Sequence, residues 1–196
     1  MKRTRSETEE TIQLLLRTGQ NHFAKHGYAK AALEDIVTDS GLTRGALYHH
    51  FKNKKGLFFA VMESIQKKIA HKIEQEARTS SNQWEQLSLG CRAFIMSAID
   101  PDHKQIILID GPAVIGWNVW RQLDANHSMK LLYSQLEQMQ RNGYFPTTLS
   151  VESLTHSLSG AMNESALWIA EQGSIDLIEE SMRVLEVYFD GLKRMK

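Results

Sequence analysis

The sequence predicts an all-α protein, and two features of its composition support that prediction. The 196 residues include only 3 prolines and almost no alternation of Val, Thr and Ile of the kind that strands need. Residues that favour helices, such as Leu, Ala, Glu, Gln, Lys and Met, are common, and the apolar fraction of 42% is enough to fill a core. We expect about nine helices: three at the N-terminus, a long fourth one and a helical C-terminal part.

The first two helices are predicted from apolar spacing and from the glycines that follow them. Over residues 7–26 apolar or small residues recur at intervals of three and four; they are Ile12, Leu15, Leu16, Gly19 and Phe23. Gly27 then ends the first helix. A shorter helix is expected over about 32–40, and Gly41 follows it where the chain needs a left-handed turn.

The third and fourth helices each begin at a residue that can cap them. Thr43 is a natural N-cap for a helix over about 43–49, because its hydroxyl accepts from an exposed backbone N–H two or three residues later. Asn53 can cap a long helix over about 54–77 in the same way. This long helix is expected to join the N-terminal region to the rest of the chain.

Loops rich in Ser, Asn, Gly and Pro divide the second half of the sequence into further helices. The expected ranges are about 82–99, 113–125, 127–142, 151–171 and 174–194. The second and third of these are alternatively one bent helix. Ser81 or Asn82 caps the first of the five, and Ser150 and Ser174 cap the last two, which should form an αα-hairpin.

The charges are distributed unevenly although the formal net charge is zero. Residues 1–60 contain ten Lys and Arg against six Asp and Glu, together with four of the eight histidines. Residues 61–196 contain thirteen basic against seventeen acidic residues. A basic N-terminal third on a neutral or acidic body is expected of a chain whose N-terminal region meets DNA.

The cysteine content and the absence of long apolar runs predict a cytoplasmic protein. The single cysteine, Cys91, excludes an internal disulfide and a thiol-based zinc site, and it is expected to be a small core residue. No apolar run approaches the roughly 20 residues that span a bilayer, and the charged start MKRTRSETEE has no signal-peptide core. We therefore expect no membrane partner.

Neither an enzyme nor a metal protein is predicted. The sequence has no Gly-x-Ser-x-Gly, Gly-x-Gly-x-x-Gly, Walker or His-Glu-x-x-His motif, so we expect no catalytic residue and no cofactor. His49 and His50 are adjacent and point about 100° apart on a helix, which prevents them from sharing an ion easily. His22 and His26 have i, i+4 spacing but no third ligand nearby in the sequence, which favours a solvated helix face.

The segment from Leu33 to Phe51 meets the physical requirements of a helix-turn-helix. It has two short helices, a tight turn with glycine and inward apolar residues on both arms, and such a pair places its second helix in the major groove. The outward face of that helix combines a bidentate donor, small residues and hydrogen-bonding rings: Thr43, Arg44, Gly45, Ala46, Tyr48 and His49. This mixture suits base edges and phosphates.

The stretch GYAKAALEDIVTDSGLTRGALYHHFKNKKGL resembles the DNA-binding signature of the TetR (tetracycline repressor) family of transcriptional regulators. The resemblance covers about residues 8–60 and is strongest from Gly41 to Lys54. It implies a ligand-responsive repressor with a helix-turn-helix DNA-binding domain over 1–53. A helical regulatory domain, for ligand binding and dimerisation, is then expected over 54–196, with 54–77 as the connecting helix.

The resemblance also implies roles for single side chains. Base contacts are expected at Arg44, Gly45 and Ala46, and phosphate contacts at Tyr48, His50 and Lys54. Thr43 is expected to serve as a cap and as a further contact. The family often has Thr or Ser where this chain has Ala31 and Ala32, so one hydroxyl contact to phosphate is missing, and the charge of Lys30 can compensate.

A small apolar or aromatic effector is expected between the helices of 82–142 and 151–171, because this region is rich in aromatic residues and Met. The expected lining residues are Phe94, Trp117, Trp120, Tyr133, Leu136 and Met162. The alternative for each is ordinary core packing. Binding is expected to displace segment 103–112, where Gly111 and Pro112 permit a hinge, and so to change the separation of two recognition helices.

Homodimerisation is expected through the last two helices, whose apolar positions exceed what one packing face needs. One stripe consists of Leu154, Leu158, Met162, Ala166 and Ile169, and the other of Leu177, Val184 and Tyr188. One short recognition helix reads too few base pairs to specify a site, which predicts a dimer on a near-palindromic operator. The competing interpretation is a helical DNA-binding or partner-binding protein without a ligand.

Overall fold

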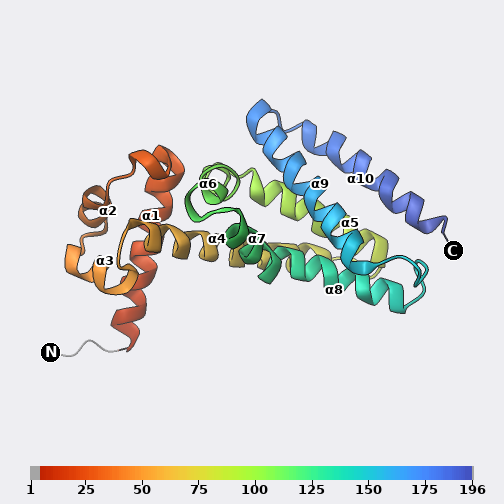
Figure 1. The fold of residues 1–196 in the computed structure, drawn as a ribbon, viewed down its shortest axis with the longest axis horizontal. Helices are drawn as coiled ribbons and strands as arrows, with labels where there is room; N and C mark the ends of the chain where they lie inside the picture. The colour runs from red at the N-terminus through yellow and green to blue at the C-terminus, as the bar shows by residue number, and fades with distance from the viewer. Residues whose placement is uncertain (1–4, 196) are drawn as a thin grey trace. The chain divides into compact units, whose positions relative to one another are not determined.

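The computed structural model describes residues 5–195, all of which lie in helices or in the loops between them (Figure 1). This part of the chain has ten α-helices, one π-helix and no strand, which confirms the all-α fold with one α-helix more than expected. None of these helices is both long and apolar enough to cross a membrane. The helices are α1 (Arg5–Lys30), α2 (Leu33–Ser40), α3 (Arg44–Phe51), α4 (Lys54–Ala77), α5 (Gln83–Ala98), the π-helix η1 (Gln105–Asp110), α6 (Gly111–Ile115), α7 (Trp117–Asn126), α8 (Ser128–Arg141), α9 (Val151–Gln172) and α10 (Leu177–Lys193).

The helices form two compact units that do not follow the order of the chain. The first unit contains the described residues through Ile65 together with Pro101–Trp120. The second contains Gln66–Asp100 and the described residues from Arg121 onward. α4 is one continuous helix with residues in both units, and so is α7. The segment that holds η1 and α6 therefore belongs with the N-terminal helices, although the whole of α5 precedes it in the chain.

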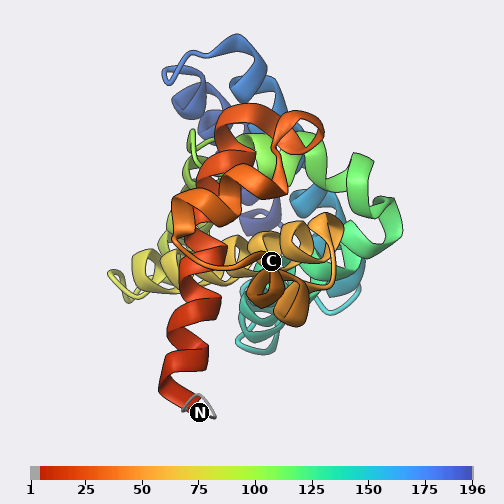
Figure 2. The ribbon, with the colours of Figure 1, turned by 90° about the vertical axis from the view of Figure 1, so that its left-hand side faces the viewer.

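The first three helices pack around a small core in the first unit (Figure 2, where these helices face the viewer). Leu15, Ile36 and Leu47, one from each helix, are fully buried. Phe23 on α1 and Phe58 on α4 meet edge to face, with ring centroids 5.1 Å apart and planes at 86°. Burying each such side chain contributes roughly 1.5–3 kcal/mol. The core therefore fixes α3 through one face and leaves its opposite face outward.

The boundaries of these helices follow the predicted capping residues. Gly27, with φ 69° and ψ 164°, interrupts α1 before its last turn, and Gly41 ends α2 in the left-handed conformation with φ 64°. The Thr43 hydroxyl accepts a backbone N–H of α3 at 3.2 Å. The side-chain oxygen of Asn53 accepts a backbone N–H of α4 at 2.9 Å. These predicted caps are confirmed.

Segment 105–120 departs from the predicted helix pattern. The π-helix η1 comes first, α6 follows it directly, and Gly116, with φ 88°, separates α6 from α7. The predicted range 113–125 is helical except at Gly116, and the prediction of one continuous helix there is wrong, because a residue with this φ does not continue a right-handed helix. The indole N–H of Trp120 donates to the Ile107 carbonyl at 2.7 Å and ties α7 back to η1.

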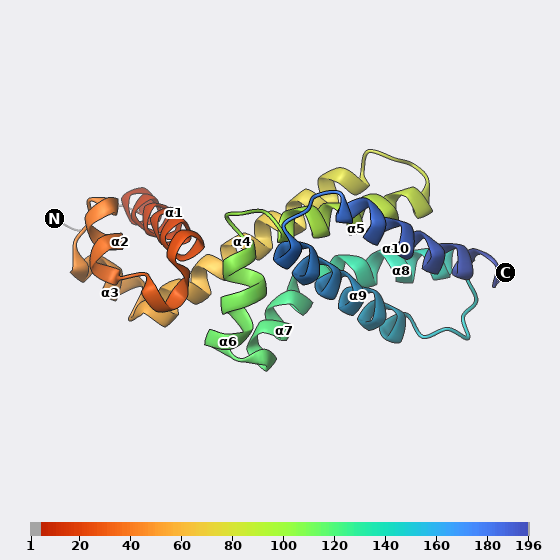
Figure 3. The same cartoon turned by 90° about the horizontal axis from the view of Figure 1, so that it is seen from above.

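In the second unit, α5, α8, α9 and α10 lie alongside one another (Figure 3). Their inward side chains are mostly Leu, Ile, Met and Phe, and Ile95, Leu136 and Phe189 are fully buried. The buried side chains of these four helices form the core of the second unit.

The caps of the C-terminal helices agree with the sequence in two of three cases. Asn82 and Ser150 cap α5 and α9 through side-chain oxygens that accept backbone N–H groups at 2.9 Å and 3.2 Å. Ser174 does not cap α10, which begins at Leu177. Residues 175–176 form a turn instead, so this predicted helix start is wrong by three positions.

Candidate nucleic-acid interface and ligand cavity

Helix α3 has an inward and an outward face. Leu47 is fully buried and holds α3 on the core of the first unit. Arg44, Gly45, Tyr48 and His49 are exposed. Arg44 and Tyr48, and likewise Gly45 and His49, are four positions apart, so the two pairs lie on neighbouring stripes of one helix face, and an approaching molecule can reach all four residues.

The Arg44 guanidinium is held by two neighbours on the protein surface. Its Nη2 atom lies 3.3 Å from Glu34 Oε1 on α2 and donates to the Tyr48 hydroxyl at 3.4 Å. The hydrogen bond with Tyr48 is the main cause that raises the pKa of Arg44, and the charges of Tyr48 and Glu34 act in the same direction. Exposed ion pairs are weak. A base or a phosphate can therefore take the place of Glu34.

Two small residues, Gly45 and Ala46, follow Arg44 in the first turn of α3. A Cβ atom at Gly45 would have only the Thr43 hydroxyl within 4 Å, at a distance of 3.8 Å. Ala46 is half-buried, and its backbone N–H is already taken by Thr43. Small side chains at this end let the backbone approach a base edge or a phosphate closely.

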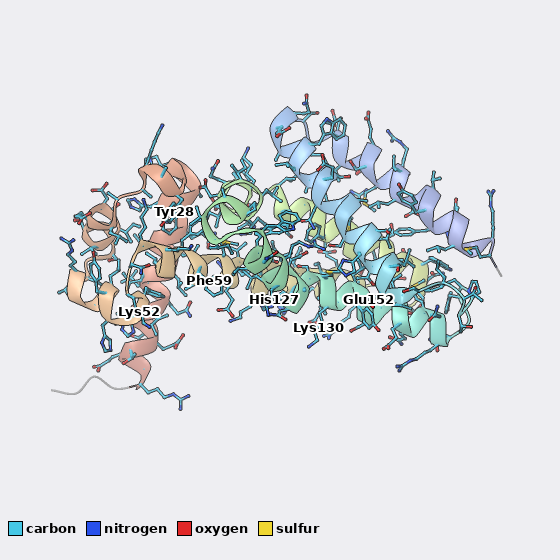
Figure 4. All side chains as sticks on the ribbon, in the orientation of Figure 1. Tyr28, Lys52, Phe59, His127, Lys130 and Glu152 are labelled. Carbon is cyan, nitrogen blue, oxygen red and sulfur yellow. The ribbon has the colours of Figure 1, made fainter. Side chains whose placement is uncertain are left out.

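The Lys54 side chain already has partners within the first unit. Its ammonium donates to the Ala29 carbonyl at 3.2 Å and lies 4.6 Å from the centroid of the Tyr28 ring. Burial lowers the pKa of Lys54, and the Asp110 carboxylate acts against that effect. Contact with a phosphate requires Lys54 to leave these partners. Lys52, at the corner between α3 and α4, is exposed (Figure 4).

Histidines of the first unit form ring contacts and a hydrogen bond to a carboxylate. His49 is exposed, His50 is half-buried, and their rings meet edge to face at 4.9 Å. His22 Nε2 lies 2.7 Å from Asp39 Oδ2 and links α1 to α2. Among residues 5–195, no group of three or more His, Cys, Asp or Glu is arranged to hold a metal ion.

The two alanines before α2 leave its N-terminus without a side-chain cap. Ala32 occupies the N-cap position and forms no cap hydrogen bond, and Ala31 is buried. Glu34 and Asp35 in the first turn of α2 instead complement the helix dipole. Lys30, just before these alanines, is exposed.

Asp110, far from the helix-turn-helix in sequence, also contacts the N-terminal helices. Its Oδ2 atom accepts the backbone N–H of Tyr28 at 2.6 Å, directly after the interruption of α1 (Figure 4, where Tyr28 is labelled). The Gln20 side-chain amide donates to the Asp102 carbonyl at 3.5 Å. Segment 101–120 is therefore anchored to α1 at two points. The sequence contains no local signal for either contact.

Gly111 allows the same segment to pack closely on its neighbours. A Cβ atom there would lie 2.9 Å from Trp120 Cδ1, 3.0 Å from the Ile106 carbonyl oxygen and 3.1 Å from Met62 Cε on α4. Real Cβ atoms do not approach a backbone oxygen and an aromatic ring this closely, so only glycine fits. The segment therefore rests on α4 as well as on α1.

The second unit contains a cavity of about 350 Å³ between α4, α5, α8 and α9. Its apolar lining includes Ile73, Cys91, Phe94, Met129, Leu132 and Met162. Two of these, Phe94 and Met162, are residues that the sequence predicted for a ligand site. Small-molecule sites have volumes of roughly 300–1,000 Å³ and mostly apolar walls, so this cavity has the size and character of one.

The other four residues predicted for a ligand site lie elsewhere. Trp117 and Trp120 belong to the first unit, where their rings stack with centroids 5.1 Å apart. Leu136 is fully buried in the core of the second unit. Tyr133 lines a separate pocket that also includes Lys130 (Figure 4).

One end of the cavity is polar and buried. Asp124, Ser128 and Ser159 line it, and the Asp124 side chain is only 2% exposed. Asp124 Oδ2 lies 3.5 Å from Arg121 Nη1 and accepts from Ser159 Oγ at 3.5 Å. Burial raises the pKa of Asp124, whereas Arg121 and hydrogen bonds from Asn163 and Ser159 act against that rise. The sequence reasoning did not single out Asp124, because nothing in its neighbourhood marks it as buried.

Cys91 lines the cavity from α5 and is buried, as predicted for a core residue. Burial raises the pKa of its thiol to about 12, and the charge of Glu186 acts in the same direction. The thiol is therefore neutral at physiological pH and contributes to the cavity as a small apolar group.

Two family profiles match this chain. The profile described as "Tetracyclin repressor-like, C-terminal domain" matches residues 84–192, which is more than half of the chain. The profile described as "Bacterial regulatory proteins, tetR family" matches residues 15–61. The chain belongs to the TetR family. Its relatives are DNA-binding transcriptional regulators and not enzymes, so the predicted family and regulatory role are confirmed.

Individual TetR-family proteins resemble the chain over different lengths. TtgR, an HTH-type transcriptional regulator of Pseudomonas putida, is 36% identical over 91 residues, which cover 46% of this chain and 41% of TtgR. AcrR of Shigella flexneri is 33% identical over 78 residues, 39% of this chain and 36% of AcrR. This chain thus matches less than half the length of these two relatives. The crystal structure of a TetR-family transcriptional regulator from Pectobacterium atrosepticum covers 97% of both chains, at 32% identity and a TM-score of 0.79.

The residues predicted for the dimer of this TetR-family protein divide into core and surface. On α9 the predicted stripe faces the core of its own unit: Leu158, Met162, Ala166 and Ile169 are buried, and Leu154 is half-buried. On α10, Leu177 is half-buried, but Val184 and Tyr188 are 57% and 53% exposed. Val187, which the sequence reasoning passed over, is 70% exposed. Among the residues predicted for the dimer, the exposed apolar side chains therefore lie on α10.

Proposed function

We propose that this TetR-family regulator is a repressor that binds a near-palindromic operator as a homodimer and is released by a small effector. The outward face of α3 supports the proposal, since Arg44 and Tyr48 are both exposed there while Leu47 holds the helix on the core. In functional language, residues 1–53 form the DNA-binding domain. Residues 54–196 form the regulatory domain, with 54–77 as its connecting helix.

Arg44 is proposed to read a base. A guanidinium can donate two parallel hydrogen bonds to guanine O6 and N7 in the major groove. Gly45 and Ala46 beside it leave room for a base edge, and Thr43 holds the helix start that presents them. His49, exposed on the same face, can add a further contact.

Phosphate contacts are assigned to Tyr48, His50 and Lys54. Tyr48 is exposed and its hydroxyl can donate to an oxygen. Lys54 can contact a phosphate only if its ammonium breaks the hydrogen bond to the Ala29 carbonyl. The exposed Lys52 needs no such rearrangement, so we add it to the residues that contribute sequence-independent charge.

The dimer is proposed to form through the outward faces of α9 and α10. On α10, Val184, Val187 and Tyr188 are spaced three and four apart and form one exposed apolar stripe. On α9, Gly160 has nothing within 4 Å of a Cβ position, and Trp168 lies two turns later and is 40% exposed. A residue without a side chain at Gly160 permits a second helix to approach closely, Trp168 adds apolar area two turns away, and a two-fold axis repeats this surface on both chains.

The effector is proposed to act from the cavity of the second unit on α4. Ile73 and Ala77 of α4 line that cavity, and the same helix continues into the first unit. Segment 101–120 is held to α1 by Asp110, so it is expected to move with the DNA-binding helices. Displacing α4 would then change the separation of two recognition helices in the dimer. A tenfold release requires about 1.4 kcal/mol of preference for the non-binding spacing.

DNA selection followed by fluorescence anisotropy tests the operator proposal. The native chain is used to select duplexes from a random-sequence pool, and the selected sites should contain an inverted repeat bound by two chains. Their half-site centres should lie about one helical turn apart or a multiple of it. Selected sites without symmetry, or binding by one chain, would contradict the proposal.

A charge placed on α10 tests the dimer surface. Val187→Glu should convert the dimer to a monomer in sedimentation at micromolar concentration and weaken operator binding. Met96→Glu is the matched control, because Met96 is 51% exposed on α5, away from the proposed stripe. A dimer that survives Val187→Glu, or one that is lost equally in both variants, would remove α10 from the interface.

A thermal-shift screen followed by operator release tests the effector proposal. A compound that binds the native state raises the melting temperature by mass action, and an effector should also lower operator affinity. Asp110→Ala should weaken this release without changing effector affinity, because Asp110 lies outside the cavity. A regulator that keeps its operator at saturating ligand would instead be a DNA-binding protein without an effector.

A further inference from the structure

The cavity of the second unit is elongated and differs chemically at its two ends. Its lining on α8 runs from Ser128 to Gln138, a rise of roughly 15 Å at 1.5 Å per residue. Asp124 and Ser159 lie at the Ser128 end. Gln135 lies towards the other end, where its amide donates to the Gln83 side chain at 3.0 Å. Between these ends, Met129, Leu131 and Leu132 of α8 line the cavity, so a matching ligand is long, apolar in the middle and polar at the tip that meets Asp124.

Asp124 is the buried acidic side chain that lines this cavity, and among the described residues the Arg121 guanidinium is the cation paired with it. Arg121, on the same helix α7, approaches with Nη1 at 3.5 Å and is 23% exposed. Its Nη2 atom lies 3.4 Å from His156 Nδ1 on α9 and 3.9 Å from Met129 Sδ on α8, so the guanidinium is shared. Ser159 and Asn163 also hydrogen-bond to Asp124, but burial remains the largest effect on this carboxylate, because the cation paired with it is 3.5 Å away and shared.

The other charged or titratable groups along the cavity do not supply a further cation at Asp124. The Cys91 thiol on α5 is neutral, and the cavity-lining residues of α8 carry no charge. On α4, Glu74 and Arg78 pair with each other at 3.9 Å. A positive group delivered by a ligand would therefore add a second cation beside a buried carboxylate whose partner Arg121 also contacts His156 and Met129.

We propose that the effector of this regulator is an elongated amphipathic amine, whose protonated amino group binds Asp124 and whose apolar body lies along Phe94, Leu132 and Met162. A primary ammonium has three N–H donors, and the Asp124, Ser128 and Ser159 oxygens at this end are acceptors for them. This inference rests on the proposed effector role of the cavity and names the class of molecule that fills it.

The charge of the ligand distinguishes this proposal from its alternatives. A neutral alcohol can hydrogen-bond to the same oxygens but adds no charge, and charge-assisted hydrogen bonds are about twice as strong as neutral ones. An anion would be repelled by Asp124 and would have to compete with it for the Arg121 guanidinium. The order of affinity expected for ligands of one shape is therefore amine, then alcohol, then carboxylate.

Proton linkage gives the proposal a second, independent signature. Burial raises the pKa of Asp124, and a bound ammonium favours its ionised form. The affinity for an amine should therefore fall as the pH is lowered through the range in which Asp124 takes up a proton. The affinity for an alcohol of the same shape should change much less.

Three probes of one length test the inference: 6-phenylhexylamine, 6-phenylhexan-1-ol and 6-phenylhexanoate. Isothermal titration of the native protein should give an affinity for the amine at least about tenfold above that for the alcohol. Asp124→Asn should abolish this preference and the pH dependence, and it keeps the shape of the side chain. Glu74→Gln is the matched control, since it makes the same change at a cavity residue that is 42% exposed, and the preference should survive.

Every other outcome contradicts either the amine inference or the effector role of the cavity, and the two kinds of outcome can be told apart. A preference for the alcohol or the carboxylate, a preference that persists in Asp124→Asn, or no binding of any probe overturns it. Operator release by the alcohol or the carboxylate but not by the amine overturns it too, while the effector role of the cavity stands. Amine binding through Asp124 without any change in operator affinity supports the inference and contradicts the effector role.

Discussion

Arg44 and Asp124 are the charged side chains of the two proposed sites, and they lie in opposite surroundings. Arg44 is exposed on α3, where its contact with Glu34 is in water. The Asp124 side chain is 2% exposed and borders an apolar cavity. An exposed pair contributes little to stability and exchanges partners easily, whereas the state of a buried charge depends on what lies against it. The proposed DNA contact is thus a charge that exchanges partners easily, and the proposed ligand contact is a charge whose state depends on the bound group.

The largest effect is expected from Leu47, the buried side chain that holds α3, and with it the exposed Arg44, on the core. Leu47→Ala removes the buried anchor beneath Arg44 and should lower the free energy of unfolding by about 2–5 kcal/mol. Urea unfolding followed by circular dichroism measures this loss. A loss well below 1 kcal/mol would mean that α3 is positioned by something other than its core contact.

Arg44→Ala, on the opposite face of the same helix, should affect recognition and leave folding unchanged. We expect affinity for the selected operator to fall about tenfold to a hundredfold, with a much smaller loss on random duplexes and an unchanged melting temperature. Lys52→Ala is the control, since it should weaken both kinds of DNA alike and reduce the salt dependence. An equal loss on both kinds of DNA for Arg44→Ala would remove the base contact.

Asp124→Asn should sharpen the contrast through the pH dependence of stability. The folded-state pKa of Asp124 is raised above its ordinary value of 3.8, so the native state holds the proton more tightly than the unfolded state. This stability is fully present below the ordinary value and is lost as the pH rises through the folded-state pKa. The variant lacks that loss, so its melting temperature relative to the native chain should increase between about pH 4 and pH 7. A constant difference across this range would show that burial does not control Asp124.

Glu34→Gln is expected to have the smallest effect. It removes an acidic group beside Arg44 on the surface proposed to meet DNA, so affinity for operator and random duplexes should rise together by less than about fivefold. Anisotropy titrations at two salt concentrations measure both affinities. If specificity falls instead, Glu34 positions Arg44 and is part of the recognition surface.

Features that depend on neighbouring residues were predictable from the sequence. Gly41, Thr43 and Asn53 act within a few positions of themselves, so their types alone indicate the turn and the caps that the structure contains. Ser174 shows the limit of this reasoning, because a serine marks a helix start only if the chain there does not turn again first. The TetR-family signature added the functional meaning of α3, which capping chemistry alone cannot provide.

Features that depend on distant residues were not predictable in this way. Asp110 and Tyr28 are 82 positions apart, and neither belongs to a motif that indicates the other. Asp124 lies in a segment with ordinary polar composition, and its burial depends on how α7, α8 and α9 pack. Trp117 and Trp120 were placed in a ligand site by their residue type, whereas the packing of η1 with α7 assigns them to the first unit.

The placement of segment 101–120 has a consequence for building hybrid regulators. Joining the N-terminal helices of this chain to the regulatory part of another family member at one junction would replace Asp110 and leave the Tyr28 N–H without its carboxylate. It would also place a foreign residue where only Gly111 fits beside Met62. A graft that carries residues through 65 together with 101–120 keeps both contacts. The interchangeable module of this protein is therefore discontinuous in sequence, and a working exchange needs more than one crossover.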